Sequence, residues 1–207
     1  MSDHDRNWIF VDERVDESTA AASARAHANE LGLSPASPAV AAQLTVLAAA
    51  SKAKSIIEIG TGTGVSGLAL LAASPESHLT TIDIEPEHQA AARNSFADAG
   101  VASTRVRFIN GRAAEVLPRM NESAYDLVFV DADPESALEY VEHGLRLVTP
   151  GGLVLVHQAL RGAANAADRS DAASAMRALI TELASSTAVV SAVSPAGAGL
   201  LQIVKLA

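Results

Sequence analysis

The residues with the clearest potential for chemistry surround three alternating glycines, Gly60, Gly62 and Gly64. They follow the isoleucine-rich stretch 56–59, whose β-branched side chains favour a buried strand. Glycines at alternate positions let the backbone turn tightly and let a ligand approach bare main chain. The apolar segment 65–74 then predicts a helix, and its first N–H groups would face the same ligand. This stretch therefore predicts a strand–turn–helix unit that binds a small molecule.

Two classes of ligand use such a turn. Gly62, Gly64 and Gly67 match the spacing of dinucleotide-binding proteins, and Asp83 ends the next predicted strand, where an acid would bind ribose. Glu58, two residues before the first glycine, instead produces a pattern that resembles methyltransferases using S-adenosylmethionine (SAM). A carboxylate there suits a ligand with an ammonium group and a sulfonium, whereas it would repel a pyrophosphate. Glu58 therefore favours SAM over a dinucleotide.

Strand-like and helix-like segments alternate along the rest of the chain. The segments that read as strands are 55–59, 78–84, 106–110, 125–131, 153–157, 189–193 and 200–204. This alternation predicts an α/β fold with a doubly wound, mostly parallel seven-stranded sheet and helices on both faces. Residues 1–17 predict a separate, partly ordered tail held by the apolar patch 8–11, with a substrate flap or a dimer contact as the alternative. Residues 18–207 contain no linker and predict a single domain.

Ligands of such sheets bind at the carboxyl ends of the strands. The residues that end the predicted strands are Gly60, Asp83, Asn110, Asp131 and His157. The strands that end on Asp131 and His157 should be neighbours about 4.8 Å apart, which brings the two side chains to one edge. A carboxylate beside an imidazole can orient it and stabilise its protonated form. We therefore expect this pair to be able to accept a proton.

Composition excludes several classes of partner. The 207 residues carry a formal net charge of −9 and no cluster of Lys and Arg, which argues against nucleic acid and anionic membranes. The absence of cysteine excludes thiolate catalysis and disulfides. The N-terminus lacks an apolar signal core, and no apolar run reaches the roughly 20 residues that span a bilayer. These features predict a cytoplasmic protein without a membrane partner.

After about residue 30 the chain resembles the O-methyltransferase family that includes the catechol and caffeoyl-CoA enzymes. The matching segments are 34–38, 58–66, 81–86, 111–113, 125–133, 147–152 and 199–200. The glycine motif is shared by many methyltransferases, whereas the strand end at 130–133 is more specific to this family. The resemblance implies a Rossmann-like fold, SAM as cofactor, methylation of a hydroxyl on a small molecule, a divalent metal in most members, and a homodimer.

The resemblance also assigns cofactor contacts, position by position. Asp83 is expected to bind the ribose hydroxyls, with Ile84 and Ala113 on either side of the adenine. The methionine part would lie on the glycine turn, with its carboxylate at Ser66 and its ammonium group near the remaining acids. The full set of expected contacts is Ala36, Glu58, Gly60, Thr61, Gly62, Gly64, Ser66, Asp83, Ile84, Ala113 and Asp133.

Two departures from the family concern the chemistry. Members usually have a lysine that can act as base at the position of Pro134, and an Asp-Asn pair of metal ligands at His157 and Gln158. Only Asp131 remains of the usual metal set, and Mg²⁺ prefers oxygen ligands that include carboxylates. The sequence therefore predicts no tightly held Mg²⁺, with His157 as the base and Asp131 as its partner. The alternative is a softer ion, Zn²⁺ or Mn²⁺, on the same two residues.

Other functions remain open from the sequence. An NAD-dependent oxidoreductase would leave Glu58 unexplained, and no obvious Tyr-x-x-x-Lys motif supports it. A SAM-binding protein with lost or regulatory chemistry would explain Pro134 and His157. We expect the N-terminal segment and residues 158–170 to line the pocket of the hydroxylated acceptor.

Overall fold

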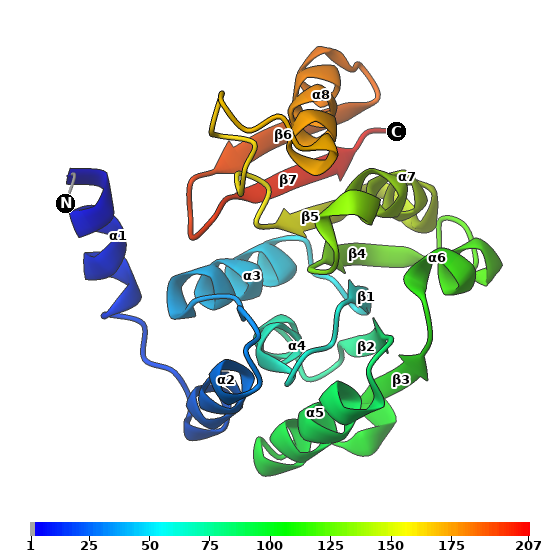
Figure 1. The fold of residues 1–207 in the computed structure, drawn as a ribbon. Coiled ribbons are helices and arrows are strands. Elements are labelled where there is room, and N and C mark those ends of the chain that lie inside the picture. The colour runs from blue at the N-terminus through cyan, green and yellow to red at the C-terminus, as the bar shows by residue number, and fades with distance from the viewer. Residues whose placement is uncertain (1–2) are drawn as a thin grey trace.

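The computed structural model, which describes residues 3–207, contains one seven-stranded sheet in the order β3-β2-β1-β4-β5-β7-β6 (Figure 1). Its strands are β1 Ser55–Ile59, β2 His78–Asp83, β3 Val106–Asn110, β4 Tyr125–Val130, β5 Val148–His157, β6 Val189–Ser194 and β7 Leu200–Lys205. The first five run parallel, whereas β7 runs antiparallel to both β5 and β6. The predicted fold class is therefore confirmed.

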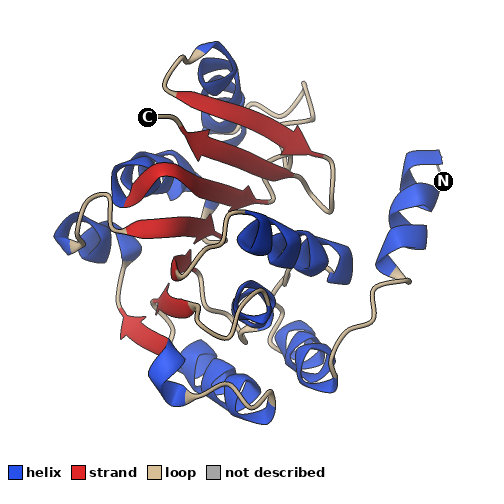
Figure 2. Cartoon of the chain, turned by 180° about the vertical axis from the view of Figure 1, so that it is seen from behind, coloured by secondary structure: helices blue, strands red, loops and turns tan. Residues whose placement is uncertain are grey.

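Helices cover both faces of the sheet (Figure 2). One hydrophobic cluster joins the sheet to α7 and α8 through residues such as Val141 and Leu179. The other joins it to α2, α3, α4 and α5 through residues such as Leu44 and Leu70. The helices are α1 Asp3–Asp12, α2 Thr19–Glu30, α3 Pro38–Ala50, α4 Val65–Ala72, α5 Pro86–Asp98, α6 Ala113–Val116, α7 Ala137–Leu147 and α8 Asp171–Ser185, with 3-10 turns η1 Ser103–Arg105, η2 Leu117–Arg119 and η3 Pro134–Ser136.

Local signals in the sequence set the start of the helices that carry loops to the site. Ser18 and Ser37 cap α2 and α3 by accepting hydrogen bonds from backbone N–H groups in the first turn. Pro38 occupies the first position of α3, where its fixed φ and missing N–H cost nothing. The loop between these helices is thereby held over the carboxyl ends of the parallel strands.

The predicted start of β5 was wrong. Residues 150–152 were expected to form a turn before β5, but they lie within β5, opposite an irregularity in its pairing between Tyr125 and Leu127 of β4. Gly152 permits this, because a Cβ there would lie only 2.8 Å from the Thr149 carbonyl oxygen. The strand therefore begins at Val148 instead of at Leu153.

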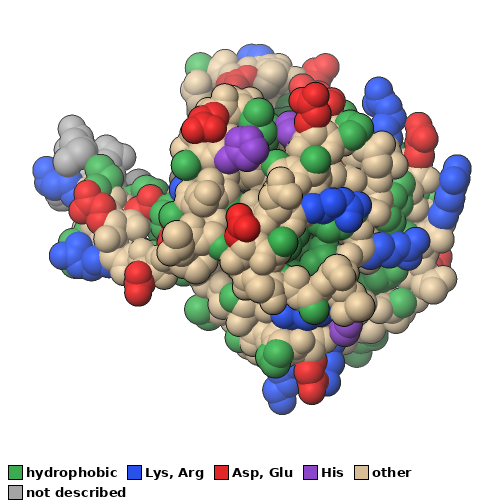
Figure 3. Space-filling view, turned by 90° about the horizontal axis from the view of Figure 1, so that it is seen from below, with side chains coloured by type: hydrophobic (Ala, Val, Ile, Leu, Met, Phe, Trp, Pro, Cys, Tyr) green, Lys and Arg blue, Asp and Glu red, His purple; other side chains and the backbone are tan. Residues whose placement is uncertain are grey.

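In the N-terminal segment, expected to be a partly ordered tail, residues Asp3–Asp12 form the helix α1. It projects from the body of the molecule (Figure 3). Trp8 packs against the cluster that contains α3, and the Asp12 Oδ1 accepts a 2.9 Å hydrogen bond from the Ala39 N–H at the start of α3. Among residues 3–207, no helix combines the length and apolar character needed to cross a membrane.

Candidate active site

A cavity of about 440 Å³ opens at the carboxyl ends of β1, β2 and β4, where the sequence predicted a ligand. Ligand pockets commonly measure about 300–1,000 Å³, so its size suits a small molecule. Its wall contains most of the predicted cofactor residues, namely Ala36, Gly60, Thr61, Gly62, Ser66, Asp83, Ile84, Ala113 and Asp133, together with Asp131. Three predicted residues, Glu58, Gly64 and His157, do not line it.

The glycine turn lies against the end of β4. Gly60 has φ +94°, and a Cβ at this position would lie 2.0 Å from the Asp131 carbonyl oxygen. Only glycine therefore allows β1 and β4 to approach this closely. Gly64 caps α4 and faces α5, since its Cβ would lie 3.3 Å from that of Ala92. Gly64 therefore packs against α5 and does not line the cavity, so its contact with the cofactor stays a prediction.

Asp83 organises the glycine turn. Its Oδ2 accepts hydrogen bonds from the N–H groups of Thr61 at 2.9 Å and Gly62 at 3.0 Å. Its Oδ1 accepts one from the Glu85 N–H at 2.9 Å and lies 3.5 Å from His88 Nδ1. A carboxylate has about four acceptor positions, so Oδ1 retains room for a ligand hydroxyl while Oδ2 is occupied by the turn.

Glu58 lies beneath the cavity, where it is 0% exposed. Its carboxylate accepts hydrogen bonds from the hydroxyls of Ser66 and Thr81, each at 2.6 Å. Burial raises the pKa of Glu58 to about 7, and Asp131 and Asp83 add to this, although the two hydrogen bonds oppose it. These two hydrogen bonds form an internal network at the start of α4. The expected position of Glu58 near the cofactor's ammonium group stays a prediction.

Ser66, which was expected to bind the carboxylate of the cofactor, belongs to the same network. Its hydroxyl donates to Glu58, so its remaining donor is the backbone N–H in the first turn of α4. The sequence placed both residues correctly near the site. It did not show that they would bind each other.

Asp133 caps the turn η3 and also lies on the cavity wall. Its Oδ2 accepts a hydrogen bond from the Ser136 N–H at 3.0 Å, and its Oδ1 accepts one from the Tyr140 hydroxyl at 3.1 Å. Burial, followed by the charge of Asp133, raises the pKa of Tyr140 and keeps its hydroxyl protonated, although a Ser136 contact opposes this. Both oxygens of Asp133 thus have protein partners beside the end of β4.

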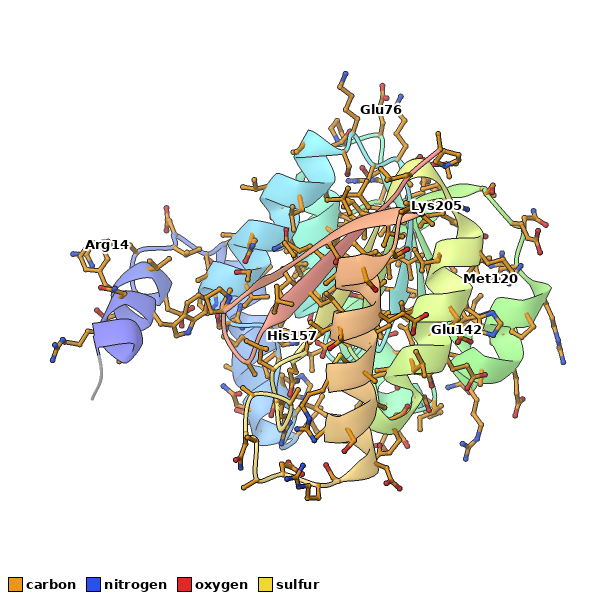
Figure 4. The ribbon with its side chains drawn as sticks, turned by 90° about the horizontal axis from the view of Figure 1, so that it is seen from above. Arg14, Glu76, Met120, Glu142, His157 and Lys205 are labelled. Carbon is orange, nitrogen blue, oxygen red and sulfur yellow. The ribbon has the colours of Figure 1, made fainter. Side chains whose placement is uncertain are left out.

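Asp131 and His157 meet as predicted, because β4 and β5 are neighbours. His157 Nδ1 lies 2.9 Å from Asp131 Oδ1, and only 9% of His157 is exposed. Figure 4 shows His157 at the end of the sheet opposite Glu76 and Lys205. Since Nδ1 faces the carboxylate, Nε2 is the nitrogen available for a proton from another group.

Some residues of the cavity wall were not predicted from the sequence. His88 projects from the first turn of α5, and Glu85 precedes that helix. Gln158 and Arg161 follow β5, in the segment that was expected to line the acceptor pocket. The N-terminal segment, predicted for the same pocket, contributes none of its described residues, because α1 projects from the body of the molecule. For His88 and Glu85, proximity to the end of β2 was the only signal in the sequence.

The described residues do not reproduce the family's metal site. No group of three or more His, Cys, Asp and Glu side chains in this part of the chain could hold an ion. The Asp131 carboxylate is bonded to His157, and the Gln158 Oε1 accepts a hydrogen bond from Arg161 Nη1 at 2.8 Å. The residues at this position therefore do not fit the metal that most members of the family bind.

Comparisons with known proteins identify the family of this chain. The model of an O-methyltransferase family matches residues 14–206. A protein of Mycobacterium sp. (strain JLS), named as an O-methyltransferase, is 43% identical over 194 residues, which are 92% of this chain and 88% of that protein. The O-methyltransferase TomG from Streptomyces achromogenes, solved in complex with SAM, is 30% identical with a TM-score of 0.83, and the match covers 100% of both chains. A Corynebacterium glutamicum structure is 29% identical with a TM-score of 0.91, covering 100% of this chain and 98% of that one. This chain belongs to the O-methyltransferase family.

Proposed function

We propose that this enzyme transfers the methyl group of SAM to a hydroxyl oxygen of a small molecule, with His157 as the proton acceptor. The observation that carries the proposal is the convergence of the Asp83-held glycine turn and the Asp131–His157 pair at one edge of the sheet. SAM supplies an electrophilic methyl group on a sulfonium. The protein must then align the acceptor and remove its proton.

The cavity fits SAM by size and charge. Asp83 Oδ1 and His88 would bind the ribose hydroxyls, and Ile84 and Ala113 would hold the adenine. The first N–H groups of α4, including that of Ser66, would receive the methionine carboxylate. Gly60, Thr61, Gly62, Ala36 and Asp133 complete the contacts that we propose on this wall. Acidic side chains along the cavity suit a cofactor with a positive sulfonium and ammonium group.

Proton removal falls to His157. A phenol has a pKa near 10, judged by tyrosine, so at neutral pH it needs a base. Asp131 holds Nδ1 and stabilises the imidazolium, which leaves Nε2 to accept the proton. A Cβ on Gly197 would lie 4.0 Å from Nε2, so the connection 195–199 covers this nitrogen. We expect that connection to move when the acceptor enters.

The test is a panel of catechols and phenolic acids incubated with SAM that carries an isotopically labelled methyl group. The proposal predicts an acceptor that gains one labelled methyl, detected by mass spectrometry, with S-adenosylhomocysteine formed in equal amount. Calorimetry with SAM and with NAD would run in parallel. Tight SAM binding without methylation of any acceptor would favour the alternative, a SAM-binding protein that has lost the transfer reaction.

Replacing Asp83 with alanine should weaken SAM binding by about 1.5–3 kcal/mol, the value of hydrogen bonds to a charged group. The variant loses a ribose ligand and also frees the N–H groups of Thr61 and Gly62. Asp98→Ala, at the exposed end of α5, removes the same charge and should leave the affinity unchanged. Calorimetry measures both. Wild-type affinity in the Asp83 variant would refute the assignment.

We also propose a homodimer. Its support is the row of apolar side chains on α1, where Ile9, Phe10 and Val11 are 43%, 54% and 48% exposed. α1 projects from the body, which leaves this patch accessible to a second copy (Figure 1). Light scattering at micromolar concentration should give twice the mass of the 21.2 kDa chain, and Phe10→Asp should lower it. A monomeric mass for the unaltered protein would contradict the dimer.

Two further expectations remain predictions. One is the division of the chain into an N-terminal segment, residues 1–17, and a methyltransferase domain, residues 18–207; residues 1–2 lie outside the described part. The other is a cytoplasmic location, which fractionation of cells would test.

A further inference from the structure

Arg161 lines the cavity on the side of β5, away from the proposed adenosine site at β2. The strand order places the end of β2, with Asp83, on one side, followed by β1, β4 and β5. Gln158 and Arg161 come directly after β5, and both line the cavity. If adenosine lies at β2, the acceptor lies toward β5. Arg161 is therefore on the acceptor side.

The exposed Arg161 side chain makes one hydrogen bond, to Gln158 in its own turn. Gln158 has a backbone φ of +58°. Residues other than glycine rarely adopt this conformation, and those that do are often found at functional sites. Arg161 N–H donates to the Gln158 carbonyl oxygen at 2.9 Å, and Arg161 Nη1 donates to Gln158 Oε1 at 2.8 Å. Backbone bonds from Ala159 to Gly199 and from Leu160 to Ala198 tie the turn to the β6–β7 connection.

Charge distinguishes Arg161 from the rest of the wall. It is the one Lys or Arg among the described residues that line the cavity, whereas four carboxylates, Asp83, Glu85, Asp131 and Asp133, lie on the same wall. No described carboxylate forms an ion pair with Arg161, and its one side-chain hydrogen bond is to Gln158. A guanidinium has five N–H donors in a planar fork, so most of its donors face no protein partner. That fork matches a carboxylate.

We propose that Arg161 binds a carboxylate of the methyl acceptor, so that the substrate is a small molecule bearing both a hydroxyl and a carboxylate. This inference rests on the proposed function for the identity of the ligand as an acceptor. A negative acceptor would be repelled by the four acids, and Arg161 offers it a cation at one defined place. Two parallel N–H···O bonds would also fix its orientation, which positions the hydroxyl at the other end of the molecule.

The experiment compares two probes that differ only in the carboxylate, 3,4-dihydroxybenzoate and catechol. Each is titrated by calorimetry into protein saturated with S-adenosylhomocysteine. The wild type should bind 3,4-dihydroxybenzoate about tenfold or more tightly than catechol, as expected for hydrogen bonds to a charged group. Arg161→Gln should remove that preference without changing affinity for catechol or for SAM. Arg169→Gln, an exposed arginine in the same segment and outside the cavity wall, makes the same charge change and should retain the preference.

Equal binding of the two probes by the wild type, no binding of either, or a preserved preference in Arg161→Gln would overturn the proposal. A loss of SAM affinity in Arg161→Gln would also overturn it, because the arginine would then serve the cofactor. Failure of the proposed function looks different. In that case the preference for the carboxylate and its dependence on Arg161 are observed, but neither probe is methylated when SAM replaces S-adenosylhomocysteine.

Discussion

Replacing His157 with alanine should lower the rate of methyl transfer by about 10²–10⁴-fold, the usual contribution of a general base. His157 is 9% exposed and lies 2.9 Å from Asp131, so the imidazole is held in one orientation and its Nε2 is the remaining proton acceptor. The loss should appear in the single-turnover rate. SAM affinity should stay unchanged, since His157 does not line the cavity.

A second histidine provides the control. His143 Nε2 lies 3.9 Å from the Glu139 carboxylate on α7, outside the cavity wall. His143→Ala therefore removes an imidazole beside a carboxylate and should leave the transfer rate near that of the wild type. Asp131→Asn should lie between the two variants, because it keeps His157 but weakens stabilisation of the imidazolium. Full activity in His157→Ala would remove this residue from the mechanism.

Replacing Glu58 with glutamine should abolish a pH dependence of stability worth about 3 kcal/mol, at about 1.36 kcal/mol for each unit by which the pKa is raised. Burial raises the pKa of Glu58 from 4.5 to about 7. Between these values the folded protein retains a proton that the unfolded chain has lost, so stability falls as pH rises from 4.5 to about 7. Above about pH 7 the loss of stability caused by Glu58 no longer changes with pH. Glutamine cannot ionise, so the variant should not show this fall in stability.

Thermal unfolding at pH 4.5 and at pH 8 measures the effect. For a chain of this size about 1 kcal/mol corresponds to 2–4 °C, so the wild-type Tm should decline about 6–12 °C more than that of Glu58→Gln over this interval. Glu182→Gln, exposed on α8, should follow the wild type. An equal decline in Tm for Glu58→Gln and the wild type would show that the pKa of Glu58 is not raised.

Much of the fold and one edge of the site could be predicted from the sequence, because both depend on local patterns. Isoleucines before alternating glycines identified β1 and its turn. The order of strand ends brought Asp131 to His157, since that contact needs only the pairing of β4 with β5.

The direction of individual side chains could not be predicted in the same way. Glu58 contacts Thr81 because β1 and β2 pair in a register that places these two residues opposite each other. Nothing in the local sequence reveals that register. The same applies to Asp83, whose Oδ2 is occupied by the glycine turn, and to residues 150–152, which extend β5 because Gly152 fits against its neighbours.

The central claim is that Asp131 and His157 carry out the proton transfer in place of a metal. Methyl transfer measured before and after removal of divalent ions with EDTA tests it most directly, with Mg²⁺, Zn²⁺ and Mn²⁺ added back separately. We predict that the rate in EDTA equals the untreated rate, and that adding back any of the three ions has no effect. Loss of activity in EDTA that Mg²⁺ alone restores would contradict the account, and restoration by Zn²⁺ or Mn²⁺ would assign the two residues to a metal instead.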